Sequence, residues 1–188
     1  MKPTLILLNG TPAAGKSTML SRYIDAHPMT LGIDIDQIWF MMGQWQASRP
    51  RSHVQKMKLA FAMTETHLKE GYDVLIAQHL ESPEYYDQLE AIAAAHNARF
   101  IEIMLMVPYK ENLKRFIRRG KASGYPTGWR PGGIMDTEGR EKKLREMYEQ
   151  MRAALKTRPN AVVLSPKDGD EAGTYKELLR VISGDADV

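Results

Sequence analysis

The sequence contains no cysteine, and this absence removes several classes of site. A chain without a thiol forms no disulfide, holds no zinc through thiolates and has no cysteine nucleophile. Such a composition suits a reducing compartment, and we expect a cytoplasmic protein. The sequence also carries little excess charge, with a formal net charge of +3 over 188 residues. A net charge this small fits a phosphate-handling enzyme better than a protein that coats nucleic acid.

Long hydrophobic runs are missing as well. Residues 4–8 form an apolar stretch that is shorter than the core of a signal peptide. Residues 101–108 contain Glu102 and fall far short of the roughly 20 apolar residues that a membrane-spanning helix needs. We find no internal repeat and no low-complexity linker, and the 43% hydrophobic content is ordinary for a globular protein. We therefore expect one domain, residues 1–188, without a membrane partner.

What the sequence does have is a phosphate-binding pattern close to its start. The segment GTPAAGKS at residues 10–17 matches G-x-x-x-x-G-K-[ST]. The apolar residues before it predict a buried parallel strand over 5–8, and the residues after it predict a helix over 16–26. The buried face of that helix is expected to carry Met19, Leu20, Tyr23 and Ile24. Strand, loop and helix in this order are the context that a phosphate loop requires.

Each fixed position of this loop has a physical reason. Glycines let backbone N–H groups turn inward around phosphate oxygens, and the start of the helix adds its unpaired donors and its dipole. Lys16 supplies a positive charge, and Ser17 is left to hold Mg²⁺. We expect a nucleoside triphosphate to contact Gly10, Thr11, Ala13, Ala14, Gly15, Lys16, Ser17 and Thr18.

Four more strands are predicted, separated by helices. The strands cover residues 30–35, 73–77, 99–107 and 161–164. The helices cover residues 38–45, 54–68, 83–96, 109–119, 137–155 and 171–182, with Ser82 as an N-cap and a basic loop over 48–52. This alternation predicts right-handed crossovers and helices on both faces of a five-stranded parallel sheet. The expected fold class is therefore a three-layer α/β sandwich.

Two aspartates come at the carboxyl end of the second predicted strand. In an open parallel sheet that edge is where ligands bind, so Asp34 and Asp36 are expected beside the phosphate loop. We interpret Asp36 as the general base that takes a proton from an acceptor hydroxyl. Asp34 is the expected metal ligand, which holds water on Mg²⁺. An aspartate at position 36 also suits the N-cap of the next helix, and capping is compatible with catalysis.

These segments resemble the P-loop kinases, which phosphorylate small hydroxyl compounds and polynucleotide ends. Asp34-Ile35-Asp36 is similar to the D-x-D of shikimate kinases, in which the first aspartate serves the metal and the second serves the substrate hydroxyl. Gly32-Ile33-Asp34 resembles a segment of chloramphenicol phosphotransferases, which leaves open which aspartate is the base. Zeta-toxin kinases share the same layout.

The spacing from Lys16 to Asp36 also resembles the kinase half of phage polynucleotide kinase. That likeness continues weakly through Arg115, Arg119 and residues 147–148. Together these resemblances imply a P-loop fold with strand order 2-3-1-4-5. They also imply ATP and Mg²⁺ as cofactors.

A glycine-rich segment follows the helix over 109–119. In the resembling kinases such a segment is a lid, here about residues 120–135, whose arginines clamp the nucleotide phosphates. Arg119 is the expected catalytic arginine, and Arg115 and Arg130 are expected nucleotide contacts, because guanidinium groups bind phosphate bidentately. Closure of a lid also excludes water. For Arg118 a solvated position at the helix end is an equal alternative.

Two segments need separate comment. One departs from the pattern of the P-loop kinases, and the role of the other rests on the resemblance alone. Gln78-His79 follows the third strand, where these kinases often carry an acidic residue or a glycine run. Gln78 cannot ligate Mg²⁺ as a carboxylate does, so more of the metal role falls to Asp34. We expect His79 to be structural rather than in contact with substrate. By resemblance only, residues 165–169 form a wall of the adenine pocket.

We predict an ATP-dependent phosphotransferase that acts on a hydroxyl of a small molecule such as an antibiotic, a nucleoside or a sugar-like acceptor. The aromatic and methionine side chains after Asp36 indicate a pocket lining with few cations. A polynucleotide 5′-hydroxyl kinase is the alternative, and a third reading is a non-catalytic nucleotide-dependent binding module. The sequence leaves open the acceptor, the preference between ATP and GTP, and whether the protein is a monomer or a homodimer. The polynucleotide alternative predicts a phosphate track, a row of basic side chains that bind the phosphates of the substrate. Its members are Arg49, Arg51, Lys56 and Lys58.

We expect Arg119→Ala to lower turnover more than it weakens ATP binding. A lid arginine acts mainly on charge that develops as the γ-phosphoryl group leaves. The measurement is kcat beside the dissociation constant for ATP in both proteins. A variant that changes only the dissociation constant makes Arg119 a ground-state anchor instead.

Overall fold

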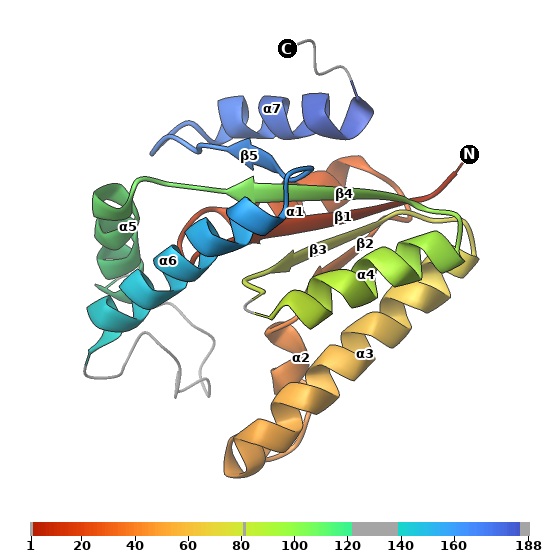
Figure 1. The fold of residues 1–188 in the computed structure, drawn as a ribbon, viewed down its shortest axis with the longest axis horizontal. Coiled ribbons are helices and arrows are strands. Elements are labelled where there is room, and N and C mark those ends of the chain that lie inside the picture. The colour runs from red at the N-terminus through yellow and green to blue at the C-terminus, as the bar shows by residue number, and fades with distance from the viewer. Residues whose placement is uncertain (1, 81, 122–138, 185–188) are drawn as a thin grey trace.

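The five predicted strands form one parallel sheet. A computed structural model describes residues 2–80, 82–121 and 139–184 (Figure 1). The strand order is β2-β3-β1-β4-β5, with every neighbouring pair parallel, so the expected order 2-3-1-4-5 is confirmed. The strands are β1 (Thr4–Gly10), β2 (Leu31–Asp34), β3 (Val74–Gln78), β4 (Arg99–Leu105) and β5 (Val162–Leu164).

Helices cover both faces of the sheet, which makes the expected three layers (Figure 1). The first face packs against α3, α4 and α6, and the second face packs against α1 and α7. In the described residues the helices are α1 (Lys16–Ala26), α2 (Gln37–Phe40), the 3₁₀ helix η1 (Trp45–Ser48), α3 (Arg49–Lys69), α4 (Pro83–Ala95), α5 (Tyr109–Lys121), α6 (Arg140–Thr157) and α7 (Glu171–Ser183).

The central strand β1 shows why the sheet has two cores. Successive side chains of a strand point to opposite faces. Leu5 and Leu7 pack with the helices of the first face, whereas Ile6 and Leu8 pack with those of the second. All four are fully buried, and this accounts for the unbroken apolar run in the sequence.

The segment between β2 and α3 differs from its prediction. The helix expected over 38–45 is only the four residues of α2, and α3 begins at Arg49, so the expected basic loop is largely the first turn of a helix. Pro50 lies in that first turn, where its missing N–H leaves no hydrogen bond unmade. Ser52 Oγ bonds to the carbonyl oxygens of Trp45 and Arg49, both at 3.0 Å, and ties this turn to η1.

Three smaller expectations need comment. Ile24 was expected on the buried face of α1 but is 36% exposed. Ser82 is the N-cap residue of α4, although its side chain makes no capping hydrogen bond. The expected lid and Arg130 fall largely among residues 122–138, outside the described residues. Among the described helices, none combines the length and the apolar character needed to cross a membrane.

We expect Leu89→Ala in α4 to lower the free energy of unfolding by about 2–5 kcal/mol, because truncating a fully buried leucine leaves a cavity. Leu59→Ala in α3 is the matched control, since Leu59 is 37% exposed, and we expect it to cost about 1 kcal/mol or less. Urea unfolding followed by tryptophan fluorescence measures both. Equal losses in the two variants contradict the core described above.

Candidate active site

The loop between β1 and α1 has a backbone that suits few residue types. Gly15 has φ of +104° and Ala13 has φ of +63°, both in the left-handed region. A side chain on Gly10 would approach the carbonyl oxygen of Leu105 in β4 to 2.9 Å, so the strand leaves room for glycine only. Of the loop residues expected to contact nucleotide, those buried are Gly10, Thr11 and Ala14, and those exposed at the start of α1 are Ser17 and Thr18.

A buried asparagine on α5 fastens this loop. The Thr11 hydroxyl donates to Asn112 Oδ1 at 2.9 Å, and Asn112 Nδ2 donates to the carbonyl oxygen of Pro12 at 2.9 Å. Asn112 is fully buried, so these bonds satisfy an amide that has no access to water. The loop and the helix that carries the arginines are therefore held together. Our sequence analysis did not single out Asn112.

A second asparagine fastens the loop from within the sheet. Asn9 Oδ1 accepts from the backbone N–H groups of Gly10 at 2.8 Å and Leu80 at 3.2 Å, and its Nδ2 donates to the hydroxyl of Tyr86. Burial raises the pKa of Tyr86 to about 12, so the phenol keeps its proton and donates in turn to the Leu80 carbonyl. A polar residue at the end of an apolar strand was the signal that our sequence analysis missed.

Lys16 folds back over the phosphate loop. Its ammonium donates to the carbonyl oxygens of Gly10 at 2.8 Å and Thr11 at 3.0 Å. Burial lowers the pKa of Lys16 to about 8; the nearby charges of Asp34 and Asp36 act to raise it, and that of Arg119 acts to lower it. Asp34, Asp36 and Arg119 are therefore near enough to Lys16 for their charges to act on its ammonium.

Ser17 and Asp34 meet as expected for a metal site. The Ser17 hydroxyl donates to Asp34 Oδ2 at 3.2 Å, and Asp34 Oδ1 accepts from the backbone N–H of Asp36 at 3.2 Å. Burial and the neighbouring charge of Asp36 raise the pKa of Asp34. The described residues contain no group of three or more acidic, histidine or cysteine ligands. Two oxygen donors fit Mg²⁺, which keeps most of its waters and binds proteins through few carboxylates.

Asp36 stands at the N-cap position of α2, but its side chain makes no capping hydrogen bond. Instead its Oδ1 accepts from Lys56 Nζ at 2.5 Å and from Gln78 Nε2 at 3.4 Å. The side chain of Asp36 is 54% exposed, so a molecule from solution has access to it. The carboxylate is thus directed toward the site rather than used to start the helix.

Lys56 corrects one of our expectations. In the polynucleotide reading it belongs to a surface phosphate track, yet it is 1% exposed and pairs with Asp36. Its ammonium lies 3.4 Å from the centroid of the Trp39 ring. The sequence held a signal for this, because Lys56 shares helical spacing with Ser52 and Ala60 on the buried face of α3.

The arginines of α5 divide into two groups. Arg115 is 8% exposed and donates through Nη2 to the carbonyl oxygen of Pro166 at 2.9 Å. Arg118 makes a bidentate pair with Asp168, at 2.8 and 2.7 Å, which lowers the pKa of that carboxyl. Both therefore tie α5 to the segment after β5. Arg119 is exposed, and its charge acts to lower the pKa of Lys16.

His79 lies behind the loop. Burial, with the charge of Lys16 adding to it, lowers the pKa of His79 to about 4, and the ring is therefore neutral at physiological pH. The Gln150 side chain on α6 and the Gly10 backbone interact with it. This environment suits the structural role expected for His79.

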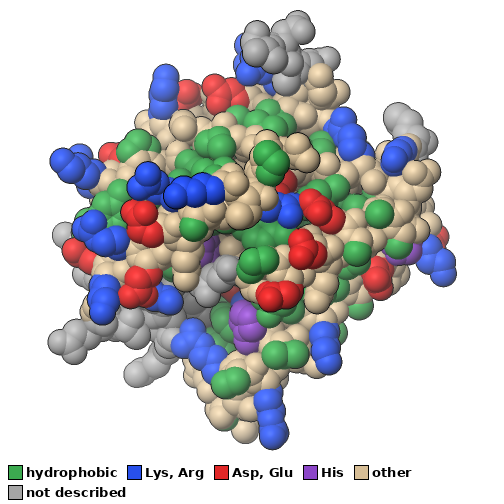
Figure 2. Space-filling view, viewed as in Figure 1, with side chains coloured by type: hydrophobic (Ala, Val, Ile, Leu, Met, Phe, Trp, Pro, Cys, Tyr) green, Lys and Arg blue, Asp and Glu red, His purple; other side chains and the backbone are tan. Residues whose placement is uncertain are grey.

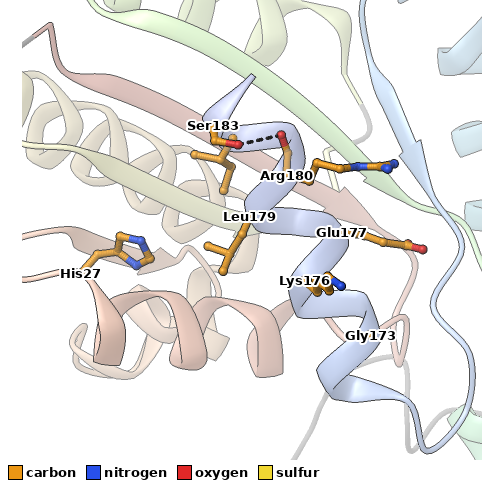
Figure 3. Close-up of a pocket in the computed structure, with 8 residues that line it drawn as sticks. His27, Gly173, Lys176, Glu177, Leu179, Arg180 and Ser183 are labelled. Atoms are coloured by element: carbon orange, nitrogen blue, oxygen red, sulfur yellow. Dashed lines mark hydrogen bonds between the residues drawn. The ribbon is translucent and has the colours of Figure 1, made fainter. Parts of the chain in front are cut away.

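A separate pocket of about 700 Å³ lies away from the phosphate loop. It is lined by His27, just after α1, and by residues of α7, of which Leu179 points toward His27 (Figure 3). Because α1 begins at the phosphate loop and spans 11 residues, His27 lies roughly 16 Å along the helix from it. The pocket is therefore not part of the site at Asp36.

Comparisons with known proteins agree with the fold. A sequence model for one family, described as an AAA domain (AAA_33), matches residues 5–129. The chain is similar to a protein of the Pnkp1/Rnl/Hen1 RNA repair complex, with TM-score 0.64 and 18% identity over 83% of this chain. It spans 46% of that polypeptide, slightly under half. No curated protein matched the sequence significantly.

Two further solved structures match over nearly their whole length. One is a protein from Chloroflexus aurantiacus described as a kinase, with TM-score 0.62 and 13% identity over 97% of both chains. The other is deoxyadenosine kinase from M. mycoides with bound dCTP, with TM-score 0.55 and 14% identity over 96% of this chain and 100% of that chain. Identities this low establish a shared fold and leave the substrate open.

The pKa of Lys16 predicts a pH-dependent affinity. Below pH 8 the ammonium is charged, and above pH 8 it loses its proton in the free protein but is held charged by bound phosphates. We expect the dissociation constant for Mg·ADP to be constant near pH 7 and to rise toward about tenfold per pH unit above 8. Titration calorimetry from pH 7 to 9.5 measures this. Lys16→Arg keeps its charge throughout and should abolish the rise, whereas a flat wild-type profile contradicts the assignment.

Proposed function

The chain belongs to the AAA domain family and has the fold of P-loop kinases, and from this premise we propose that it transfers the γ-phosphoryl group of ATP to a hydroxyl of a small molecule. The observation that carries the proposal is the placement of Asp36. Its carboxylate is half-exposed beside the phosphate loop, makes no helix cap and is held by a buried cation. A carboxylate in this position suits a general base for an acceptor hydroxyl.

Each residue of the site has a part in this reaction. The backbone N–H groups of the phosphate loop and Lys16 bind the β- and γ-phosphates, and Arg119 adds charge from the end of α5. Asp36 accepts the proton of the acceptor hydroxyl as its oxygen bonds to the γ-phosphorus and the bond to ADP breaks. Ser17 and Asp34 would hold Mg²⁺, which supplies a Lewis acid that neutralises the phosphate oxygens.

The surroundings of Asp36 favour a small acceptor with apolar surface. Phe40 at the end of α2 and Met41, the residue after it, follow Asp36 by four and five positions and are 43% and 76% exposed. Apolar side chains next to a few convergent polar groups are typical of small-molecule sites. Burial of Lys56 also removes one cation from the phosphate track that a polynucleotide acceptor needs.

A polynucleotide 5′-hydroxyl kinase remains the second candidate. The likeness to a protein of an RNA repair complex supports it, as do the exposed Arg49 and Arg51 at the start of α3. On the face shown in Figure 2, however, acidic and basic side chains are interspersed, without the single-sign surface typical of nucleic-acid binding. Affinity for an oligonucleotide that falls steeply with salt would favour this candidate.

The test is a screen of γ-labelled ATP against hydroxyl compounds, nucleosides and 5′-hydroxyl oligonucleotides, with incorporation of label as the readout. Label in a small molecule supports the proposal, and label in oligonucleotides alone supports the second candidate. If nucleotide binds and no acceptor is labelled, the protein is a nucleotide-dependent binding module instead.

We expect Asp36→Asn to lower acceptor phosphorylation by about 10² to 10⁴, the usual range for a general base, with Mg·ATP affinity within a few-fold. The amide oxygen of Asn can still accept from Lys56, so the shape of the site is kept. Asp34→Asn should instead raise the Mg²⁺ concentration that the reaction needs. The control is Asp25→Asn, an exposed carboxylate near the far end of α1.

The opposite outcome would reassign these roles. If Asp36→Asn leaves transfer intact while Asp34→Asn removes it, the base and the metal ligand are exchanged. If neither substitution affects transfer more than Asp25→Asn does, the kinase mechanism itself is wrong.

A further inference from the structure

Lys56 is a charged side chain in a place where charges are rare. Its side chain is 2% exposed in the middle of α3. Lysines are almost never buried to this extent without a partner, because removing an ammonium from water is costly. A lysine that served only the stability of α3 could be replaced by an apolar residue, since it shares the buried face with Met57 and Ala60. The burial therefore calls for another explanation.

Two aromatic rings fix the position of this ammonium. Lys56 Nζ lies 3.4 Å from the centroid of the Trp39 ring, and Trp39 is stacked on Trp45 with centroids 4.9 Å apart and planes 12° apart. A cation over an indole face is attracted by the negative charge of that face. The stacked rings thus support the ammonium on one side, and its hydrogen bond to the Asp36 carboxylate lies on another side.

We propose that Lys56 is a positioning residue for phosphoryl transfer, which holds the Asp36 carboxylate with one oxygen engaged and the other presented to the acceptor. The proposal rests on the function proposed above. The hydrogen bonds that the described residues make to this carboxylate fall on Oδ1, from Lys56 at 2.5 Å and Gln78 at 3.4 Å. Oδ2 is then the oxygen that accepts the proton.

The charges around Asp36 show why a permanent cation is needed there. Asp34 lies two residues away, and the bound triphosphate adds further negative charge on the same side. Lys16 and Arg119 are the other cations of the site, and the proposed reaction assigns both to the phosphates. Lys56 cannot be drawn to the phosphates, because it is buried between Trp39 and Asp36. It therefore offsets the repulsion between the base and the γ-phosphoryl group throughout the reaction.

The proton and electron movements balance with Lys56 unchanged. The acceptor O–H proton moves to Asp36 Oδ2, and the acceptor oxygen forms a bond to the γ-phosphorus. The bond between that phosphorus and the β,γ-bridging oxygen breaks, and its electron pair leaves on ADP. Lys56 keeps its proton from beginning to end, so it acts through Asp36 rather than on the reacting atoms.

The first experiment uses the acceptor that wild-type protein labels best in the screen, with Lys56→Met as the variant and the exposed Lys69→Met on the same helix as the control. We expect Lys56→Met to lower kcat about 10- to 100-fold with KM for Mg·ATP within about threefold, since only the base is disturbed. Lys56→Arg, which keeps the charge, should recover most of kcat. Lys69→Met should behave as wild type.

The second experiment asks whether Lys56 acts through Asp36. In an Asp36→Asn background the base is already lost, so adding Lys56→Met should lower kcat by less than about threefold. The double variant also leaves no unpaired charge in the protein interior, so it remains informative if Lys56→Met alone does not fold. Thermal melting and Mg·ADP binding establish that each variant is folded.

Several outcomes overturn the inference. Lys56→Met with kcat within twofold of wild type does so, as does a loss that Lys56→Arg does not recover. A full further loss on adding Lys56→Met to Asp36→Asn means that Lys56 acts independently of the base. In each of these cases the wild type still transfers phosphate, and the proposed function stands. If the wild type labels no acceptor, the proposed function fails first and this inference fails with it.

Discussion

The parallel pairing of β1 between β3 and β4 is the constraint on which the site depends. It sets Gly10 opposite Leu105 and Asn9 opposite Gln78, so the phosphate loop leaves the sheet from its centre. Parallel strands all end at one edge, and β2 delivers Asp34 to the same edge through its pairing with β3. A one-residue slip of β1 would move every one of its side chains to the opposite face, so the packing of both cores fixes its register.

Buried polar side chains convert this edge into a shaped site. Asn9 and Asn112 both hold the first part of the phosphate loop, at Gly10 and at Thr11 and Pro12, and their hydrogen bonds go to backbone or hydroxyl groups. Arg115 does the same for the segment after β5 through the Pro166 carbonyl. Polar groups removed from water are stable only when they are paired, so these bonds specify one arrangement of loop and helix.

The cations of the site differ in their freedom to move. Lys16 donates to loop carbonyls, and burial lowers its pKa to about 8. In the free protein its ammonium therefore loses its proton more readily than an exposed lysine does, and a bound phosphate stabilises the charged form. Lys56 is enclosed and stays with Asp36. In the proposed reaction, separate cations for the phosphates and for the base avoid competition between two anionic partners.

Much of this structure was determined by local sequence. Periodicity and turn residues predict the phosphate loop, the bounds of α1 at Lys16–Ala26 and the five strands. The resemblance to P-loop kinases predicts the order of those strands. Tertiary structure alone decided that Asp36 pairs with Lys56 rather than capping α2, and that Arg115 binds Pro166. Sequence periodicity reports which face of an element is buried. It does not report which side chain from another element meets that face, because such contacts depend on how the packed helices and strands fit together.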